Sequence, residues 1–313
     1  MPSSAIRTVT DVDEYRAANR RSCVELTVTI PGSFTASITR IDLHRLWMQR
    51  GHESLPRIRH AEPDPERNII AFLTQEGQRT VRNGVEFRPG DVALLSPRHS
   101  HRYRSFGPLH WGGMSLSLAD MAEISATFAG RALMPQHDEQ IVTPPLAAMT
   151  KFQRLHAAAG HLAEHAPEII ARPEAARGLE EALIEAMVDC LLAPDRREDT
   201  AARRRHTAVI QRFRAALEAS DDKAVYLPEL CHRIGVSGRT LRLCCQEHLG
   251  MGPKRFLLLR RMHLARRALR EAGADATVTD IATEFGFWEL GRFAVEYKAL
   301  FGEAPSETLR HSI

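Results

Sequence analysis

The chain lacks the features of a membrane or secreted protein. No apolar run approaches the roughly 18 residues that read as a membrane span, and residues 1–20 contain no apolar core of a secretory signal. The five cysteines are odd in number and have no Cys-x-x-Cys spacing, so neither a disulfide framework nor a zinc site is indicated. We therefore expect a cytoplasmic protein with reduced thiols and no membrane partner.

Lysine is also scarce, since only 4 of the 42 basic residues are Lys, which is typical of a high-GC bacterial coding sequence. The remaining composition excludes disorder and fibres. A length of 313 residues, with 43% hydrophobic and 26% charged residues, predicts an ordinary globular protein of two or three domains.

The small net charge of +3 conceals unlike parts. Residues 1–195 carry 21 basic and 24 acidic side chains, net −3, whereas residues 203–270 carry 16 and 5, net +11. Residues 271–313 carry 3 basic and 8 acidic side chains, net −5. This asymmetry indicates a polyanion-binding segment joined to a domain with another role, although a solvated basic surface would give the same totals.

Short runs of alternating apolar and polar residues, broken by turn residues, fill positions 42–114. Asn83-Gly84 between two such runs predicts a hairpin, because a type I′ turn needs positive φ at both central residues. Closely spaced strands without intervening helices favour a small barrel or sandwich. Residues 149–162 and 179–191 then carry apolar stripes at helical spacing, which predict two amphipathic helices that form either core or a dimer seam.

From Thr207 onward the pattern is helical and contains an internal repeat. An apolar helical stripe at 227–234, a break at Gly235 and a second helix at 238–249 recur as 278–285, Gly286 and 289–301. A short helix, a glycine-containing turn and a second helix is typical of the helix-turn-helix motif, whose second helix enters the DNA major groove. Two such motifs in tandem in the basic half predict a DNA-binding protein.

The repeat resembles the DNA-binding domain of the AraC/XylS family of bacterial transcription regulators. The resemblance covers about residues 207–310 and includes Val236-Ser237, Leu249-Gly250, Pro253, Gly286-Phe287, Phe293, Tyr297, Lys298, Phe301, Gly302 and Pro305-Ser306. It implies an α+β multidomain protein: a cupin-like β-barrel with amphipathic helices for effector binding and dimerisation (1–193), a linker (194–206), and an all-α domain of two helix-turn-helix units (207–313).

The first recognition helix should bury Leu241 and Cys245 and present the other side to DNA. The DNA-binding residues expected there are Ser237, Gly238, Arg239, Thr240, Arg242 and Gln246. Arg and Gln suit bidentate contacts with guanine and adenine edges, although a phosphate contact would use the same arginines. The sequence departs from the family at Leu243, where Arg is frequent, and at Cys245, where Phe is usual, so we expect an altered base preference.

The second recognition helix should bury Phe293, Tyr297 and Phe301. Its expected DNA-binding residues are Glu289, Leu290, Gly291, Arg292 and Lys298. Val295 stands where the family has a common Arg, and the segment is acidic, so this unit should bind DNA more weakly than the first. On the connecting helix, at 253–270, some arginines should contact phosphates and others should pair with acidic residues of the other units; Arg260 is expected to be structural.

The strand-rich segment resembles the family's effector domain through Pro89-Gly90-Asp91, Leu94-Leu95, Pro97 and His101. Its expected effector-binding residues are His99, His101 and Arg79, and neighbouring arginines could pair with an anionic ligand. His99-x-His101 also fits a metal interpretation, but the companion Glu and a second His motif are missing, so we expect no metal and no other cofactor. Cys244-Cys245 similarly allows a thiol sensor or a simple core role.

We therefore interpret the chain as a transcription regulator rather than an enzyme. It would bind double-stranded promoter DNA as a homodimer and respond to a small-molecule effector. Activation in contact with RNA polymerase is one mode of action, and the sequence leaves activation and repression open. The alternatives are a metal-dependent cupin enzyme fused to a DNA-binding domain, and an effector-independent regulator whose barrel only dimerises. No nucleophile elbow or phosphate loop supports the enzyme.

Overall fold

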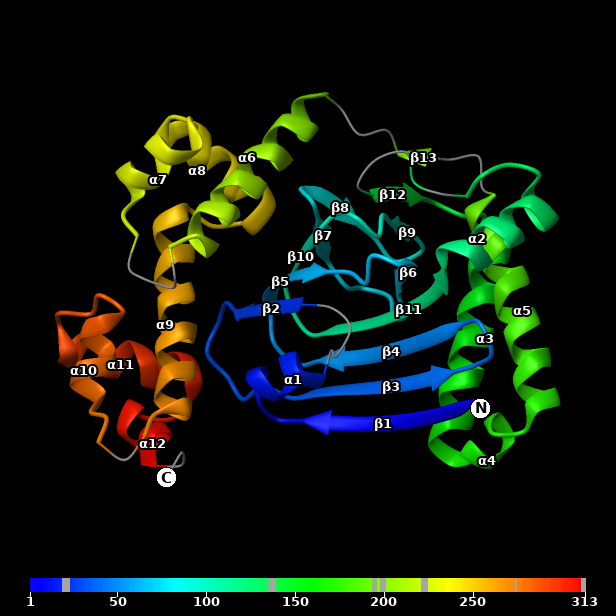
Figure 1. Ribbon diagram of the computed structural model, residues 1–313, viewed down its shortest axis with the longest axis horizontal. Coiled ribbons are helices and arrows are strands. Elements are labelled where there is room, and N and C mark those ends of the chain that lie inside the picture. The colour runs from blue at the N-terminus through cyan, green and yellow to red at the C-terminus, as the bar shows by residue number, and fades with distance from the viewer. Residues whose placement is uncertain are drawn as a thin grey trace.

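The computed structural model describes residues 1–18, 23–133, 135, 139–192, 196–197, 201–220, 225–273 and 275–310. Within these ranges, antiparallel sheets and their covering helices occupy the N-terminal part, and helices alone occupy the part from Ala201 onward (Figure 1). The α+β class predicted from the sequence is confirmed. No helix in the described ranges is long and apolar enough to cross a bilayer.

The strands form two antiparallel sheets. The larger sheet has the order β1 (Ser3–Val9), β3 (Ala36–Asp42), β4 (Trp47–Glu53), β11 (Leu109–Ser117), β6 (Arg67–Leu73), β9 (Val92–Leu95), β12 (Glu139–Val142) and β13 (Arg196–Arg197). The smaller sheet has the order β2 (Cys23–Val28), β5 (Arg57–Glu62), β10 (His101–Ser105), β7 (Thr80–Arg82) and β8 (Val85–Phe87). The closed cupin-like barrel expected from the sequence is not confirmed, because strand pairing among the described residues stays within each sheet.

The hairpin between β7 and β8 forms at the predicted position. Thr80 pairs with Phe87, and the two residues of the turn, Asn83 and Gly84, have φ angles of 44° and 80°. Positive φ at both central positions is the type I′ requirement, which asparagine and glycine meet at low steric cost. The sequence prediction of this turn is therefore confirmed.

Two long helices, α3 (Leu146–His165) and α5 (Pro173–Leu191), cover the larger sheet and confirm the two predicted amphipathic helices. Phe152 and Met187 from these helices share a buried core with Ile70 and Met114 from the sheet. The two faces of the larger sheet therefore have different environments, because alternate side chains along its strands point to the helices on one face and to the smaller sheet on the other. The shorter helical elements here are α1 (Val12–Ala18), α2 (Leu118–Ile124), the π-helical turn η1 (Ser125–Ala129) and α4 (Pro167–Ile170).

The C-terminal part consists of α6 (Ala201–Glu218), α7 (Leu227–Ile234), α8 (Gly238–Leu249), α9 (Pro253–Glu271), α10 (Val278–Glu284), α11 (Leu290–Phe301) and α12 (Pro305–Arg310). One core forms around Phe213 and Leu241 and joins α6, α7 and α8. A second core forms around Phe293 and Tyr297 and joins α9 to α10 and α11. The long helix α9 connects the two units and runs beside β2, and its Arg267 and Arg270 reach Asp13 of α1 (Figure 1).

Each helix-turn-helix unit turns at a glycine with positive φ. Gly235 ends α7 with φ 67°, and Gly286 follows α10 with φ 77°. Left-handed backbone of this kind favours glycine and stops the first helix at the residue where the sequence predicts the break. Of the predicted linker 194–206, residues 196–197 form β13 and Ala201 begins α6, while 194–195 and 198–200 lie outside the described residues.

Candidate functional site

Helix α8 presents the first set of expected DNA contacts on an accessible face. Ser237 precedes the helix, and its hydroxyl accepts a hydrogen bond of 3.1 Å from the backbone N–H of Thr240, so this serine is an N-cap. Leu241 and Cys245 are buried, as predicted. The remaining expected contacts point away from that core and are exposed: Gly238, Arg239, Arg242 and Gln246. Arg239 and Arg242 have no ion-pair partner among the described residues.

The adjacent thiols of α8 belong to the core of the first unit. Cys244 and Cys245 are both buried, and burial raises the pKa of Cys245 to about 12. A thiol with so high a pKa is protonated at neutral pH, and the thiolate is the form that reacts with oxidants. This environment favours the core role over the thiol-sensor interpretation.

Helix α11 presents the second set of expected DNA contacts. Phe293 and Tyr297 are buried as predicted, while Phe301 is only partly buried. The Tyr297 and Thr308 hydroxyls lie 2.8 Å apart and tie α11 to α12. The expected contacts in this unit are all exposed: Glu289, Leu290, Gly291, Arg292 and Lys298.

Arg292 differs from Arg239 and Arg242 because two carboxylates engage it, Glu289 just before α11 and Glu296 within the helix. Its Nε lies 2.9 Å from Glu296 Oε1, and its Nη1 lies 3.5 Å from Glu289 Oε2. The hydrogen bond to Glu296, followed by the charges of both glutamates, raises the pKa of Arg292. To contact a base or a phosphate, this guanidinium must leave two acidic partners, so it is poorly prepared for a polyanion.

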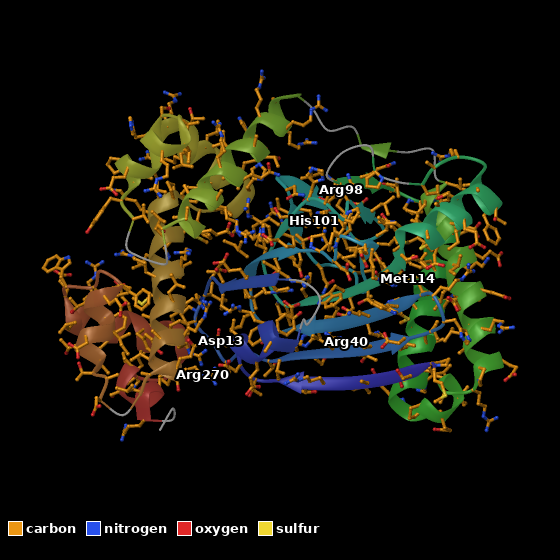
Figure 2. The ribbon with its side chains drawn as sticks, in the orientation of Figure 1. Asp13, Arg40, Arg98, His101, Met114 and Arg270 are labelled. Atoms are coloured by element: carbon orange, nitrogen blue, oxygen red, sulfur yellow. The ribbon has the colours of Figure 1, made fainter. Side chains whose placement is uncertain are left out.

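Carboxylates of the sheet domain pair with the α9 arginines Arg260, Arg266, Arg267 and Arg270. Arg266 Nη1 lies 2.8 Å from Asp11 Oδ2, and Arg270 also pairs with Asp11. Arg270 and Asp13 lie close together at the junction of the two parts of the chain, with 3.8 Å between Nη1 and Oδ2 (Figure 2). Arg260 is buried, as expected for a structural residue, with its Nε 3.8 Å from a Glu25 oxygen. These arginines therefore have carboxylate partners in the sheet domain, far from α9 in the sequence.

A cavity of about 470 Å³ lies between the two sheets. Apolar side chains from the larger sheet and aromatic side chains from both sheets form most of its wall, including Trp47, Ile69, Phe72, Phe87, Leu95, Tyr103 and Trp111. The polar residues of its lining include Arg40, Arg59, Arg67, Arg82 and His101. This volume and mixture of an apolar wall with a few polar groups are typical of a small-molecule site.

Arg59 is a cation of this cavity whose described contacts are with Tyr103, whose ring centroid lies 5.5 Å from its guanidinium carbon. Its Nη1 lies 3.3 Å from the Tyr103 hydroxyl, its Nε is buried without a hydrogen-bond partner, and no carboxylate pairs with it among the described residues. In contrast, Arg82 Nε lies 2.6 Å from Glu139 Oε1, and Arg67 Nε donates to Ser115 Oγ at 2.9 Å. Burial raises the pKa of Tyr103, but Arg59 and Arg57 outweigh that effect and lower it overall. An anion would complete the interactions of Arg59.

The expected effector-binding residues lie in different places. His101 is buried and lines the cavity, and its Nε2 lies 3.0 Å from the Ser96 carbonyl oxygen. His99 and Arg79 are exposed and outside the cavity lining; Arg79 stacks over Phe106 at 4.5 Å. A search of the described residues finds no cluster of three His, Cys, Asp or Glu side chains placed to hold a metal ion.

Arg59 and Tyr103 were not among the expected residues. The alternation in β5 places Arg57, Arg59 and Ala61 on one face, and that pattern was the available sequence signal. This alternation does not identify Arg59 as a cavity residue unless β5 is known to lie opposite β11 across a cavity. The relevant neighbours come from strands far apart in the chain.

Comparison with known proteins supports the helix-turn-helix assignment. A family model described as a helix-turn-helix domain matches residues 230–311. The chain is 43% identical over 95 residues to a probable thc operon regulatory protein of Rhodococcus erythropolis, covering 30% of this chain and 29% of that protein. It is 35% identical over 95 residues to a XylDLEGF operon transcriptional activator of Pseudomonas putida, covering 30% of each. The match thus spans under a third of the length of these curated relatives.

Two solved structures are similar as well. A probable AraC family transcriptional regulator from Rhodopseudomonas palustris CGA009 is 31% identical, with 33% of this chain and 96% of that chain covered and a TM-score of 0.31. The AraC-like transcriptional activator CuxR is 14% identical, with 88% of this chain and 98% of that chain covered and a TM-score of 0.45.

The two helix-turn-helix units joined by α9, together with the matched family model, define the C-terminal part of the chain as a helix-turn-helix domain. This domain is similar in sequence to the corresponding part of the two operon regulators named above.

Proposed function

We propose that the protein is a sequence-specific regulator that binds promoter DNA with α8 and α11. The observation that carries this proposal is the exposed pair Arg239 and Arg242 on a capped helix, within a segment of net charge +11. Guanidinium groups without carboxylate partners are available to base edges and phosphates in the major groove. Two recognition helices about 34 Å apart would contact successive major grooves on one face of the duplex.

The direct test is selection of bound duplexes from a random pool by the full-length protein at fixed salt. The proposal expects enrichment of a sequence with two conserved blocks about one helical turn apart, and loss of that enrichment for Arg239→Ala. Equal binding of all duplexes by the wild-type protein would contradict it. Because several relatives are named as activators, we extend the proposal to activation of transcription through contact with RNA polymerase.

The sheet domain would act as a cupin-like effector domain. The cavity between its sheets is large enough for a small organic molecule, and Arg59 supplies a cation that lacks a carboxylate partner among the described residues. The surrounding aromatic side chains would contact an apolar body. We therefore propose an organic anion as effector, with His101 in the same wall and no catalytic role for the cavity.

The domain boundaries and oligomeric state belong to the same proposal. Residues 1–193 would bind the effector and dimerise, 194–206 would link the domains, and 207–313 would bind DNA. Leu146 is 83% exposed on α3 beside Leu155 and Ala182, and this apolar surface would form the homodimer contact. Leu146→Asp would then shift the protein from dimer to monomer in light scattering. As promoter DNA is the proposed partner, the protein would act in the bacterial cytoplasm.

A further inference from the structure

The exposed residues of α8 form a single stripe. Four exposed side chains recur at spacings of three and four residues, which places them on one face of the helix: Arg239, Arg242, Leu243 and Gln246. The opposite face carries the buried residues Leu241, Cys244, Cys245, His248 and Leu249. Leu243 is 57% exposed, so an aliphatic side chain lies in the middle of an otherwise polar stripe.

Helix α11 carries the equivalent stripe. Both helices have 12 residues, and the capping glycines Gly250 and Gly302 differ by 302 − 250 = 52 positions. The same offset relates Leu243 to Val295, and it converts the remaining members of the first stripe into Gly291, Ala294 and Lys298. Val295 is 71% exposed. The two recognition helices therefore present an aliphatic side chain at the same position.

The neighbours of these two side chains differ on one side. The residues three and four positions earlier on the helix are Arg239 and Thr240 for Leu243, and Gly291 and Arg292 for Val295. Glu289 and Glu296 engage Arg292, and Gly291 leaves the other side of Val295 open. A side chain at Gly291 would meet no atom within 4 Å in the free protein, so the fold itself does not require glycine there.

We infer that Leu243 and Val295 each contact the C5 methyl group of a thymine, one in each half of the bound site. This inference rests on the proposed DNA binding. The C5 methyl group is the apolar feature that base edges present in the major groove, and contact with an aliphatic side chain removes both from water. A protein partner is a poorer occupant for the α8 stripe, because residues 203–270 around it have a net charge of +11 and Arg239 and Arg242 lie on the stripe itself.

The test removes only the methyl group. After a bound sequence has been selected with the full-length protein, each thymine is replaced in turn by deoxyuridine, which keeps the base pair. For the wild-type protein, we expect one position in each half-site to raise the dissociation constant about three- to five-fold, the size associated with one buried methyl group. Leu243→Ala should abolish the effect in one half-site, and Val295→Ala should abolish it in the other.

The matched control is Ile6→Ala, which shortens an exposed aliphatic side chain on β1, outside both helix-turn-helix units. It should retain both deoxyuridine effects. Gly291→Leu adds a second measurement, since it should leave thermal unfolding nearly unchanged but weaken binding of the selected duplex more than ten-fold.

The outcomes separate the inference from the function on which it rests. Failure to select any sequence would overturn the proposed function. A selected site whose affinity is insensitive to every deoxyuridine substitution would overturn the inference alone. A deoxyuridine effect that persists undiminished in both Leu243→Ala and Val295→Ala would also overturn it, because the methyl contact would then come from other residues.

Discussion

Arg266 on α9 and Asp11 before α1 are joined by an ion pair of 2.8 Å between Nη1 and Oδ2. Both side chains are close to nine-tenths buried, and Arg270 binds the same carboxylate. Burial tends to raise the pKa of Asp11, but Arg266 and Arg270 outweigh it and lower the pKa below its usual value. The helix that connects the two DNA-binding units is thereby attached to the sheet domain.

The first prediction concerns this attachment. Asp11→Asn and Arg266→Gln should each lower the free energy of unfolding, because each removes one partner of a largely buried charge, although Arg270 still pairs with Asp11 and Glu303 with Arg266. The double variant should lose less than the sum of the two, with a coupling energy of about 1–3 kcal/mol. Denaturant titration of the wild-type protein, the two single variants and the double variant at neutral pH measures this coupling energy. The contribution should disappear as the pH falls through the lowered pKa of Asp11, and additive losses at pH 7 would contradict the pairing.

The second prediction concerns His156 on α3. Burial, followed by the charge of Arg50, lowers its pKa from 6.5 to about 3, and its Nε2 lies 3.0 Å from the Gln49 carbonyl oxygen. Because the unfolded chain binds a proton below pH 6.5 and the folded chain does not, the free energy of unfolding should fall as the pH decreases from 6.5 towards 3. His156→Gln removes the titrating group. The free energy of unfolding of this variant should therefore fall less steeply with decreasing pH over this range, by the slope that corresponds to about one bound proton. Parallel curves would contradict the assignment.

The third prediction compares the two recognition helices. Arg239→Ala should reduce affinity for the selected duplex by about 1–3 kcal/mol, the usual size of a specific base contact. Arg292→Ala should cost less, because Glu289 and Glu296 already engage that guanidinium. Titrations at one salt concentration decide the order, and a larger loss for Arg292→Ala would contradict it. Glu296→Gln is a useful companion and should strengthen binding by releasing Arg292.

The fourth prediction concerns the cavity. Carboxylates with an apolar body, such as hexanoate and 2-naphthoate, should raise the unfolding temperature of the wild-type protein more than the corresponding amides do. Arg59→Met keeps much of the side-chain volume but removes the cation, so it should abolish the difference between acid and amide. Arg79→Met is the matched control, since Arg79 lies outside the cavity lining, and it should behave like the wild type. Equal shifts for acids and amides would contradict the anionic ligand.

The local elements of this protein could be predicted from short stretches of sequence. The Asn83-Gly84 hairpin, α3 and α5, and the glycine turns at Gly235 and Gly286 depend on backbone preferences and apolar spacing within about 20 residues. The exposed faces of α8 and α11 follow in the same way, because a helix with one buried stripe must present the opposite side. The division of the strands between two sheets was not predicted, since alternation identifies strand faces but not strand partners.

The sequence by itself determined the tandem helix-turn-helix domain, because its motifs lie within contiguous segments whose order and spacing carry the information. Only the tertiary structure decided which charges meet. It brought Arg59 and Tyr103 into one cavity wall and paired Arg266 and Arg270 with Asp11 some 250 residues earlier (266 − 11 = 255). Electrostatic interactions depend on distances of a few ångströms, and those distances arise only when strands and helices remote in the chain are packed together.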